Sequence, residues 1–183
     1  MAATVDARFT RTNCYAEEKS LPAEYPPFMF GYGVIDTVIA KIRDREAPEV
    51  FSHDYLRYTL GFTRESDRAF IALAKRIGLL TAEGKPTEIY RELLKPKQAQ
   101  AALAKAIAQG FPSLYARNAK VHQLDRKELA ALIAEITGLG PGHATARAIV
   151  GTFLALRDVA SPRVEVKREE ADRRKVAERR HGR

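Results

Sequence analysis

The chain has 183 residues, of which 45% are hydrophobic, and it carries a formal net charge of +8 at pH 7. This length and apolar content support one or two small globular domains and exclude an intrinsically disordered chain. The single cysteine, Cys14, excludes an intramolecular disulfide and a cysteine-rich zinc site, and it fits a reducing cytoplasm. The positive charge favours polyanionic partners such as nucleic acid or an anionic membrane surface.

The two ends of the chain are predicted to be tails. Residues 1–24 show neither a helical nor a strand period, so we expect a disordered N-terminal tail. Residues 161–183 alternate acidic residues with Lys and Arg and carry about half of the excess positive charge; they form either a solvated helix or a disordered basic tail. No apolar run is long enough for a signal-peptide core or a membrane span. We therefore expect a cytoplasmic protein without a membrane partner.

Residues 25–95 are predicted to form a winged helix-turn-helix-like domain. It begins with an aromatic segment, residues 25–32, in which two prolines fix an extended backbone. We expect the rings of this segment to cap the core, although rings on such a segment can also stack on nucleobases. The first helix is expected at residues 34–42, where apolar residues recur at helical spacing.

The centre of this domain is the stretch of residues 51–94. A short helix is expected after Ser52, which is a suitable N-cap. The next helix is expected to end at Gly78. Apolar residues recur in it at the spacing that places them on one face, which is why a helix is predicted here. That stripe consists of Phe70, Leu73, Ala74 and Ile77. Residues 79–81 are expected to be a short extended run and residues 82–85 a turn, which form a small β-hairpin, the wing. Residues 86–88 then start a further helix that Thr87 caps.

The second helix of such a pair is the one that enters a DNA major groove, with its N-terminal residues nearest the base edges. Arginine pairs with guanine or phosphate through two parallel hydrogen bonds, and a lysine on the wing can contact the DNA backbone as a point charge. The candidate nucleic-acid-binding residues are Arg64, Ser66, Arg68, Lys75 and Arg76 on the helix and Lys85 on the wing. Alternatively, these side chains form an ordinary solvated surface, and the acidic Glu65 and Asp67 dilute the charge.

Three segments of this sequence together resemble a known family. They are YPPFMFGYGVIDTVIAKI, APEVFSHDYLRYTLGF and SDRAFIALAKRIGLLTAEGKPTEIYRELL, and their most specific pieces are Leu60-Gly61-Phe62 and residues 78–90. These segments are similar to the bacterial domain-of-unknown-function 5343 family, and the similarity extends to about Ala160. The resemblance implies one bacterial domain with a winged-helix-like front half. It implies no catalytic residue, because that family has no established activity.

Residues 96–160 are predicted to form an alanine-rich helical subdomain packed on the first domain. Within it, Asp125 and Glu128 have the spacing of a capping box before a helix. The loop at residues 138–144 has a Gly-Leu-Gly-Pro pattern that resembles the phosphate-binding loop of helix-hairpin-helix modules. Glycine and proline are also what any sharp turn between helices needs, so both interpretations of this loop remain open.

No residue pattern typical of catalysis is present. The sequence lacks the glycine-rich phosphate loop, the nucleophile elbow and the H-E-x-x-H zinc motif. The four histidines have no acidic partner at ligand spacing, and the adjacent His53 and Asp54 would not face each other on a helix. We therefore expect no enzyme activity, no bound metal and no small-molecule cofactor.

Two functions of different classes remain. The first is a non-catalytic module, such as a regulator, that binds double-stranded DNA through the second helix and the wing with help from the basic tail. The second is a protein-interaction scaffold without a nucleic-acid role, in which the C-terminal helices bind a protein partner or form a homodimer. Only the first predicts duplex binding that weakens steeply with salt.

Overall fold

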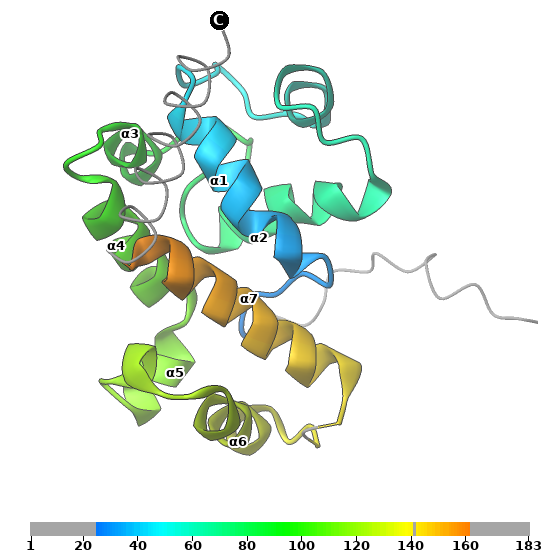
Figure 1. Cartoon of the computed structure of the whole chain (residues 1–183), viewed down its shortest axis with the longest axis vertical. Helices are drawn as coiled ribbons and strands as arrows, with labels where there is room; N and C mark the ends of the chain where they lie inside the picture. The colour runs from blue at the N-terminus through cyan, green and yellow to red at the C-terminus, as the bar shows by residue number, and fades with distance from the viewer. Residues whose placement is uncertain (1–24, 141, 162–183) are drawn as a thin grey trace, which may run out of the picture.

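The computed structural model describes residues 25–140 and 142–161, and in these ranges the chain forms helices and no β-strand (Figure 1). The α-helices are α1 (Ile35–Arg43), α2 (Ala69–Arg76), α3 (Glu88–Leu94), α4 (Ala99–Gly110), α5 (Pro112–Arg117), α6 (Arg126–Thr137) and α7 (Ala144–Ala160). The shorter segments are η1 (Tyr32–Val34), the π-helical η2 (Tyr55–Thr59), η3 (Glu65–Arg68) and η4 (Val121–Gln123). The prediction of a mainly helical chain is confirmed. None of these described helices has the length and apolar content needed to cross a membrane.

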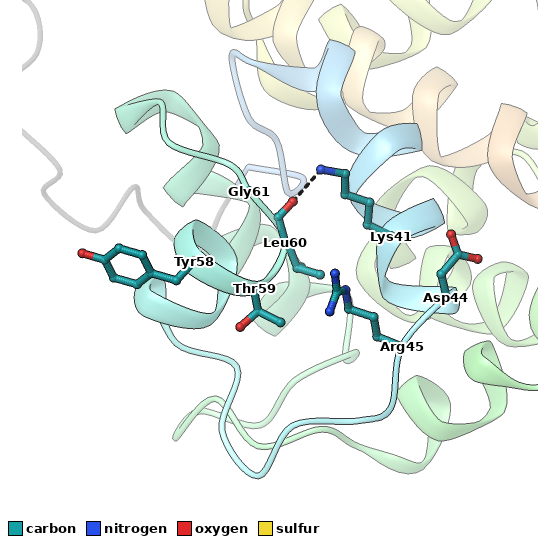
Figure 2. Close-up of a pocket in the computed structure, with 7 residues that line it drawn as sticks. All are labelled: Lys41, Asp44, Arg45, Tyr58, Thr59, Leu60 and Gly61. Carbon is teal, nitrogen blue, oxygen red and sulfur yellow. Dashed lines mark hydrogen bonds between the residues drawn. The ribbon is translucent and has the colours of Figure 1, made fainter.

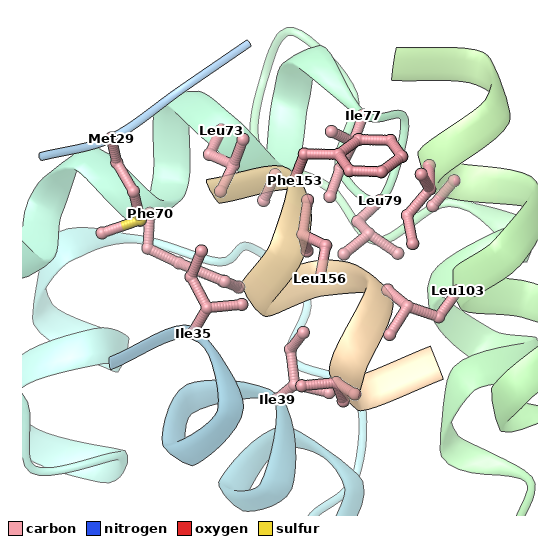
Figure 3. Packing of buried hydrophobic residues seen from close by; sticks show 14 of the residues in the cluster. Met29, Ile35, Ile39, Phe70, Leu73, Ile77, Leu79, Leu103, Phe153 and Leu156 are labelled. Atoms are coloured by element: carbon pink, nitrogen blue, oxygen red, sulfur yellow. The ribbon is translucent and has the colours of Figure 1, made fainter. Parts of the chain in front are cut away.

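Helix α7 is the centre of the fold. Most of its residues are buried, because apolar side chains cover most of its circumference and only a few positions, such as Arg147 and Asp158, are exposed. It contacts η1, α1, α4 and α6, and Figure 1 shows it crossing the middle of the molecule. The ring of Phe153 on α7 lies edge-on to Phe111, with 5.2 Å between the ring centroids. Figure 3 shows Phe153 and Leu156 among side chains of α1, α2 and α4, so α7 joins buried residues on both sides of residue 95 into one core cluster.

The segment at residues 25–31, which we call the strap, is fastened to α7. Met29 is buried, and its backbone N–H donates a hydrogen bond to the Thr152 hydroxyl oxygen at 3.0 Å. That hydroxyl in turn donates to the Met29 carbonyl oxygen at 3.2 Å. Beyond the strap, the ring of Tyr32 packs directly on Gly151, where a Cβ atom would collide with it. The strap therefore closes one side of the core.

The predicted β-hairpin wing is wrong. One isolated antiparallel bridge, between Leu80 and Pro86, forms where the sequence predicts two strands. Leu79 and Leu80 are both buried, so this segment lacks the alternation of a half-exposed strand, and Pro86 has no N–H with which to extend a ladder. The carbonyl oxygen of Gly84 also accepts a hydrogen bond from the Phe51 N–H at 2.8 Å. These interactions hold the segment as a compact turn against the body of the protein, not as a projecting wing.

Two of the predicted helix starts have the side-chain hydrogen bonds that the sequence indicates. The Ser52 hydroxyl accepts a hydrogen bond from the Tyr55 N–H at 3.1 Å, although the helix that follows is π-helical, with the Leu60 N–H donating to the Tyr55 carbonyl oxygen. At the start of α6, the Glu128 N–H donates to the Asp125 carboxylate at 2.7 Å, and the Asp125 N–H donates to the Glu128 carboxylate at 3.0 Å. The predicted capping box is therefore confirmed. The predicted tails lie outside the described residues, apart from Ser161.

Candidate nucleic-acid interface

The candidate interface is the exposed side of the helical run formed by η3 and α2, residues 65–76. The predicted apolar stripe of this run is buried: Phe70, Leu73, Ala74 and Ile77 are each at most 1% exposed. Arg68 and Lys75 are exposed on the opposite side. Because these two residues are seven positions apart, they lie about two helical turns, or about 10 Å, from each other on one face. The amphipathic helix therefore presents both cations in the same direction.

The acidic residues at the start of this run are tied into local structure. The backbone N–H of Arg64 donates to the Asp67 carboxylate at 3.3 Å, and Asp67 is only 3% exposed. A carboxylate in this position stabilises the partly positive N-terminal end of a helix. The exposed Glu65 forms an ion pair with Arg68, while Arg64 and Ser66 are exposed. Asp67 is thus withdrawn from the surface, whereas Glu65 competes with any anion for Arg68.

Arg76, at the end of α2, has a structural partner. Its guanidinium donates a hydrogen bond to the backbone carbonyl oxygen of Tyr25, and burial lowers its pKa. At the other end of the strap, a Cβ atom on Gly31 would lie 3.6 Å from the Cβ of Ser66. The strap therefore runs antiparallel beside the helical run, and Arg76 clamps it there.

Lys75 and Lys85 lie near the same carboxylate, that of Glu83. A hydrogen bond from Thr81 is the main cause that lowers the pKa of Glu83, and the charges of Lys85 and Lys75 lower it further. Lys75 and Lys85 are thus both exposed, and the charges of both act on Glu83, although no wing is present. We call Arg64, Ser66, Arg68, Lys75 and Lys85 the basic face.

Phe30 is an exposed aromatic residue that the sequence-based interpretation of the strap as a core cap missed. Its side chain is 66% exposed, whereas the preceding Met29 is 2% exposed. The rings of Phe30 and Phe28 lie edge to face, with 5.5 Å between their centroids. In an extended segment alternate side chains point to opposite sides, so a buried Met29 favours an exposed Phe30, whereas Phe28 is partly buried against the core. This alternation is the signal that could have identified Phe30.

An open pocket of about 540 Å³ lies between the end of α1 and η2 (Figure 2). It is lined by Lys41, Asp44, Arg45, Tyr58, Thr59, Leu60 and Gly61. The Lys41 ammonium group donates to the Leu60 carbonyl oxygen at 2.6 Å and lies 4.8 Å from the centre of the Phe62 ring, so it fastens α1 to η2. Figure 2 shows Tyr58 pointing away from Lys41. Across the described parts of the chain, no group of three or more His, Cys, Asp or Glu side chains is placed to hold a metal ion.

The glycine-proline loop joins α6 to α7. Gly138 ends α6 in the left-handed conformation, with φ of 69°. The Nδ1 atom of His143 accepts a hydrogen bond from the Thr145 N–H at 3.2 Å, so the imidazole caps α7. Pro141 lies outside the described residues. The phosphate-binding interpretation of this loop therefore stays a prediction.

Comparison with known proteins identifies a family. The sequence model of a family described as "Family of unknown function (DUF5343)" matches residues 27–165, which is more than half of the chain. The chain belongs to this family, and the resemblance carried by its three segments is confirmed. No curated protein matches the chain, and no solved structure matches it.

Proposed function

We propose that this member of the DUF5343 family is a non-catalytic module that binds double-stranded DNA through its basic face. The observation that carries the proposal is the placement of Arg68 and Lys75 about two turns apart on the exposed side of the helical run formed by η3 and α2, with Lys75 and Lys85 both acting on Glu83. The net charge of +8 supports a polyanionic partner for such a face.

Each residue of the basic face has a role that follows from its position. Arg64 and Ser66 lie at the start of the helical run, whose N-terminal residues would lie nearest the base edges of a bound duplex. Arg68 and Lys75 neutralise phosphates farther along the same face. Lys85 supplies one point charge to the DNA backbone, because the turn that carries it is too compact to enter a groove.

Two exposed acidic residues limit the affinity of this face. Arg68 has to exchange its ion pair with Glu65 for a phosphate, and Glu83 repels phosphates near Lys75 and Lys85. An exposed ion pair contributes only about 0–1 kcal/mol, whereas a bidentate pairing of guanidinium with phosphate is stronger. The exchange is therefore favourable. Replacing both acids, in Glu65→Gln/Glu83→Gln, is expected to tighten DNA binding.

The experiment that tests the proposal is an anisotropy titration of a labelled DNA duplex with the full chain at two salt concentrations. Neutralising about three phosphates predicts a loss of affinity of about fortyfold between about 50 and about 200 mM salt. A second chain without residues 162–183 serves as the control for nonspecific binding by the tail. The proposal is contradicted if the full chain does not bind, or if all binding disappears with the tail.

A protein-interaction scaffold, built on the C-terminal helices, is the second candidate function. The observation that favours it is that α4 exposes small side chains, namely Ala101, Ala104 and Ala108, between its buried residues. Small side chains let another helix approach closely. Sedimentation of the chain at several concentrations tests this function, which predicts a dimer that Ala104→Glu disrupts.

A further inference from the structure

We infer that the DNA bound by the basic face has an unpaired base next to the duplex, and that the exposed ring of Phe30 stacks on this base. The inference rests on the proposed function and names the kind of DNA that the site takes. Four features carry it: the exposure of the ring, the rigidity of the backbone around it, the position of the strap beside the helical run, and the cations that this run exposes.

The backbone on both sides of Phe30 is fixed. Met29 is held to Thr152 by two hydrogen bonds, at 3.0 and 3.2 Å, and Gly31 lies against Ser66. The ring itself rests edge to face against Phe28. A single exposed apolar side chain is common on protein surfaces and by itself indicates nothing. An exposed ring on a fixed backbone is different, because it loses little conformational freedom when a flat ligand stacks on it.

The position of Phe30 in the strap connects its ring with the surface that we propose for DNA binding. Phe30 precedes Gly31, and Gly31 lies against Ser66, in the first turn of the helical run. The N-terminal residues of such a helix lie nearest the bases of a bound duplex. A base that leaves the duplex at this end of the helix therefore meets the ring of Phe30. Proteins that bind single strands combine aromatic platforms with cations in this way.

The positive charges on the neighbouring helical run favour a nucleobase over a protein side chain as the ligand of the Phe30 ring. Arg64 and Arg68 are exposed on the same helical run as Ser66. The centre of a protein–protein interface is depleted of charge, whereas a nucleotide joins a flat ring to a phosphate. An exposed ring on a strap that contacts this cationic helical run therefore matches both parts of a nucleotide.

The test uses the full chain and three labelled DNA probes. The first is a blunt duplex, the second is the same duplex with a short single-stranded extension, and the third carries the same extension without bases. The last two probes have the same phosphates, so they differ only in the bases that can stack. We expect the extension with bases to bind about tenfold more tightly than the abasic extension.

Substitutions of Phe30 test whether its ring causes this difference in affinity between the two extensions. Phe30→Ala is expected to reduce the ratio of the two affinities to about one, and so is Phe30→Leu, which stays apolar but has no flat ring. Phe30→Trp is expected to keep the ratio. Tyr58→Ala removes a ring that is 75% exposed at the pocket, and it is expected to leave the ratio unchanged. Thermal unfolding of each variant shows whether it remains folded.

The outcomes separate the inference from the proposed function. If the chain binds none of the three probes, both are overturned. If it binds the blunt duplex but does not distinguish the two extensions, only the inference about Phe30 is overturned. It is also overturned if Phe30→Leu keeps the ratio, if Tyr58→Ala abolishes it, or if Phe30→Ala instead dissociates an oligomer of the wild-type chain.

Discussion

The guanidinium of Arg76 donates a hydrogen bond to the backbone carbonyl oxygen of Tyr25, which lies 51 residues earlier in the sequence. This bond fixes the start of the strap to the end of α2, and the contact of Gly31 with Ser66 fixes the other end. The strap, the helical run and α7 are thereby held as one unit. The surface that we propose for DNA binding is therefore preformed.

The hydrogen bond from Arg76 to Tyr25 predicts that Arg76 contributes more to the free energy of unfolding than its neighbour Lys75 does. Arg76→Gln is expected to lower the free energy of unfolding by about 1 kcal/mol, because it removes a hydrogen bond from a charged donor. Lys75→Gln removes the same charge from an exposed side chain and is expected to change stability by less than about 0.5 kcal/mol. Denaturant titrations of both variants measure the difference. Equal effects would show that Arg76 does not clamp the strap.

The Thr152 hydroxyl is predicted to be essential for fastening the strap. Thr152→Val keeps the shape of the side chain but leaves the buried N–H and carbonyl groups of Met29 without their partner. An unsatisfied buried group costs about 1–3 kcal/mol, so we expect a loss of that size in the free energy of unfolding. Thr152→Ser keeps the hydroxyl and is expected to lose only about 1 kcal/mol for its missing methyl group. The strap would not depend on this hydroxyl if the valine variant were the more stable of the two.

Gly151 is predicted to be required for the close packing of Tyr32 on α7. Gly151→Ala places a Cβ where the Tyr32 ring lies, and such overpacking costs about 1–3 kcal/mol, which the better helix propensity of alanine offsets only in part. Gly33→Ala is the matched control, since no atom lies within 4 Å of its added Cβ. Thermal unfolding is expected to show a lower melting temperature for the first variant alone. A melting temperature equal to that of Gly33→Ala would contradict this packing.

The burial of Tyr90 predicts that the free energy of unfolding depends on pH in the alkaline range. Burial raises the pKa of Tyr90 above its ordinary value of about 10, so its hydroxyl ionises more readily in the unfolded chain. The unfolded state then binds fewer protons than the folded state above about pH 10, and the free energy of unfolding falls as the pH rises. Within the described residues no group makes a hydrogen bond of good geometry with the buried Tyr90 hydroxyl, and the nearby Tyr55 hydroxyl raises the pKa of Tyr90 further.

Tyr90→Phe is expected to remove both effects. It deletes the unsatisfied hydroxyl, which raises the free energy of unfolding by about 1 kcal/mol near neutral pH. It also reduces the loss of stability between about pH 8 and about pH 11, as urea titrations at the two values would measure. A variant that is less stable than the wild type at neutral pH would indicate that the hydroxyl has a stabilising partner.

The features that could be predicted from the sequence depend on neighbouring residues. The capping box of Asp125 and Glu128 spans three positions, and the apolar stripe of α2 spans two turns, so both are visible as spacing. The exposure of Arg68 and Lys75 follows from the same periodicity. These predictions needed no knowledge of what packs against the helix.

The features that were not predicted depend on distant residues. The hairpin fails because Leu79 and Leu80 are both drawn into the core and Gly84 is bonded to Phe51, and none of these partners is visible in local spacing. The pairing of Arg76 with Tyr25 is equally distant in sequence. The sequence therefore indicated the direction of the basic face and the extended backbone of the strap, but not the position of the strap beside the helical run.

The most direct test of the basic face compares two pairs of substitutions in one DNA titration. Arg68→Ala/Lys75→Ala removes two charges from the basic face, and Lys127→Ala/Arg147→Ala removes two charges from exposed positions on α6 and α7 that do not belong to this face. Both variants have the same net charge, so they differ only in where the charge is lost. We expect the first pair to bind a DNA duplex at least about tenfold more weakly than the second and to reduce the salt slope by about two. Equal affinities of the two variants, or weaker binding by the second, would contradict the account.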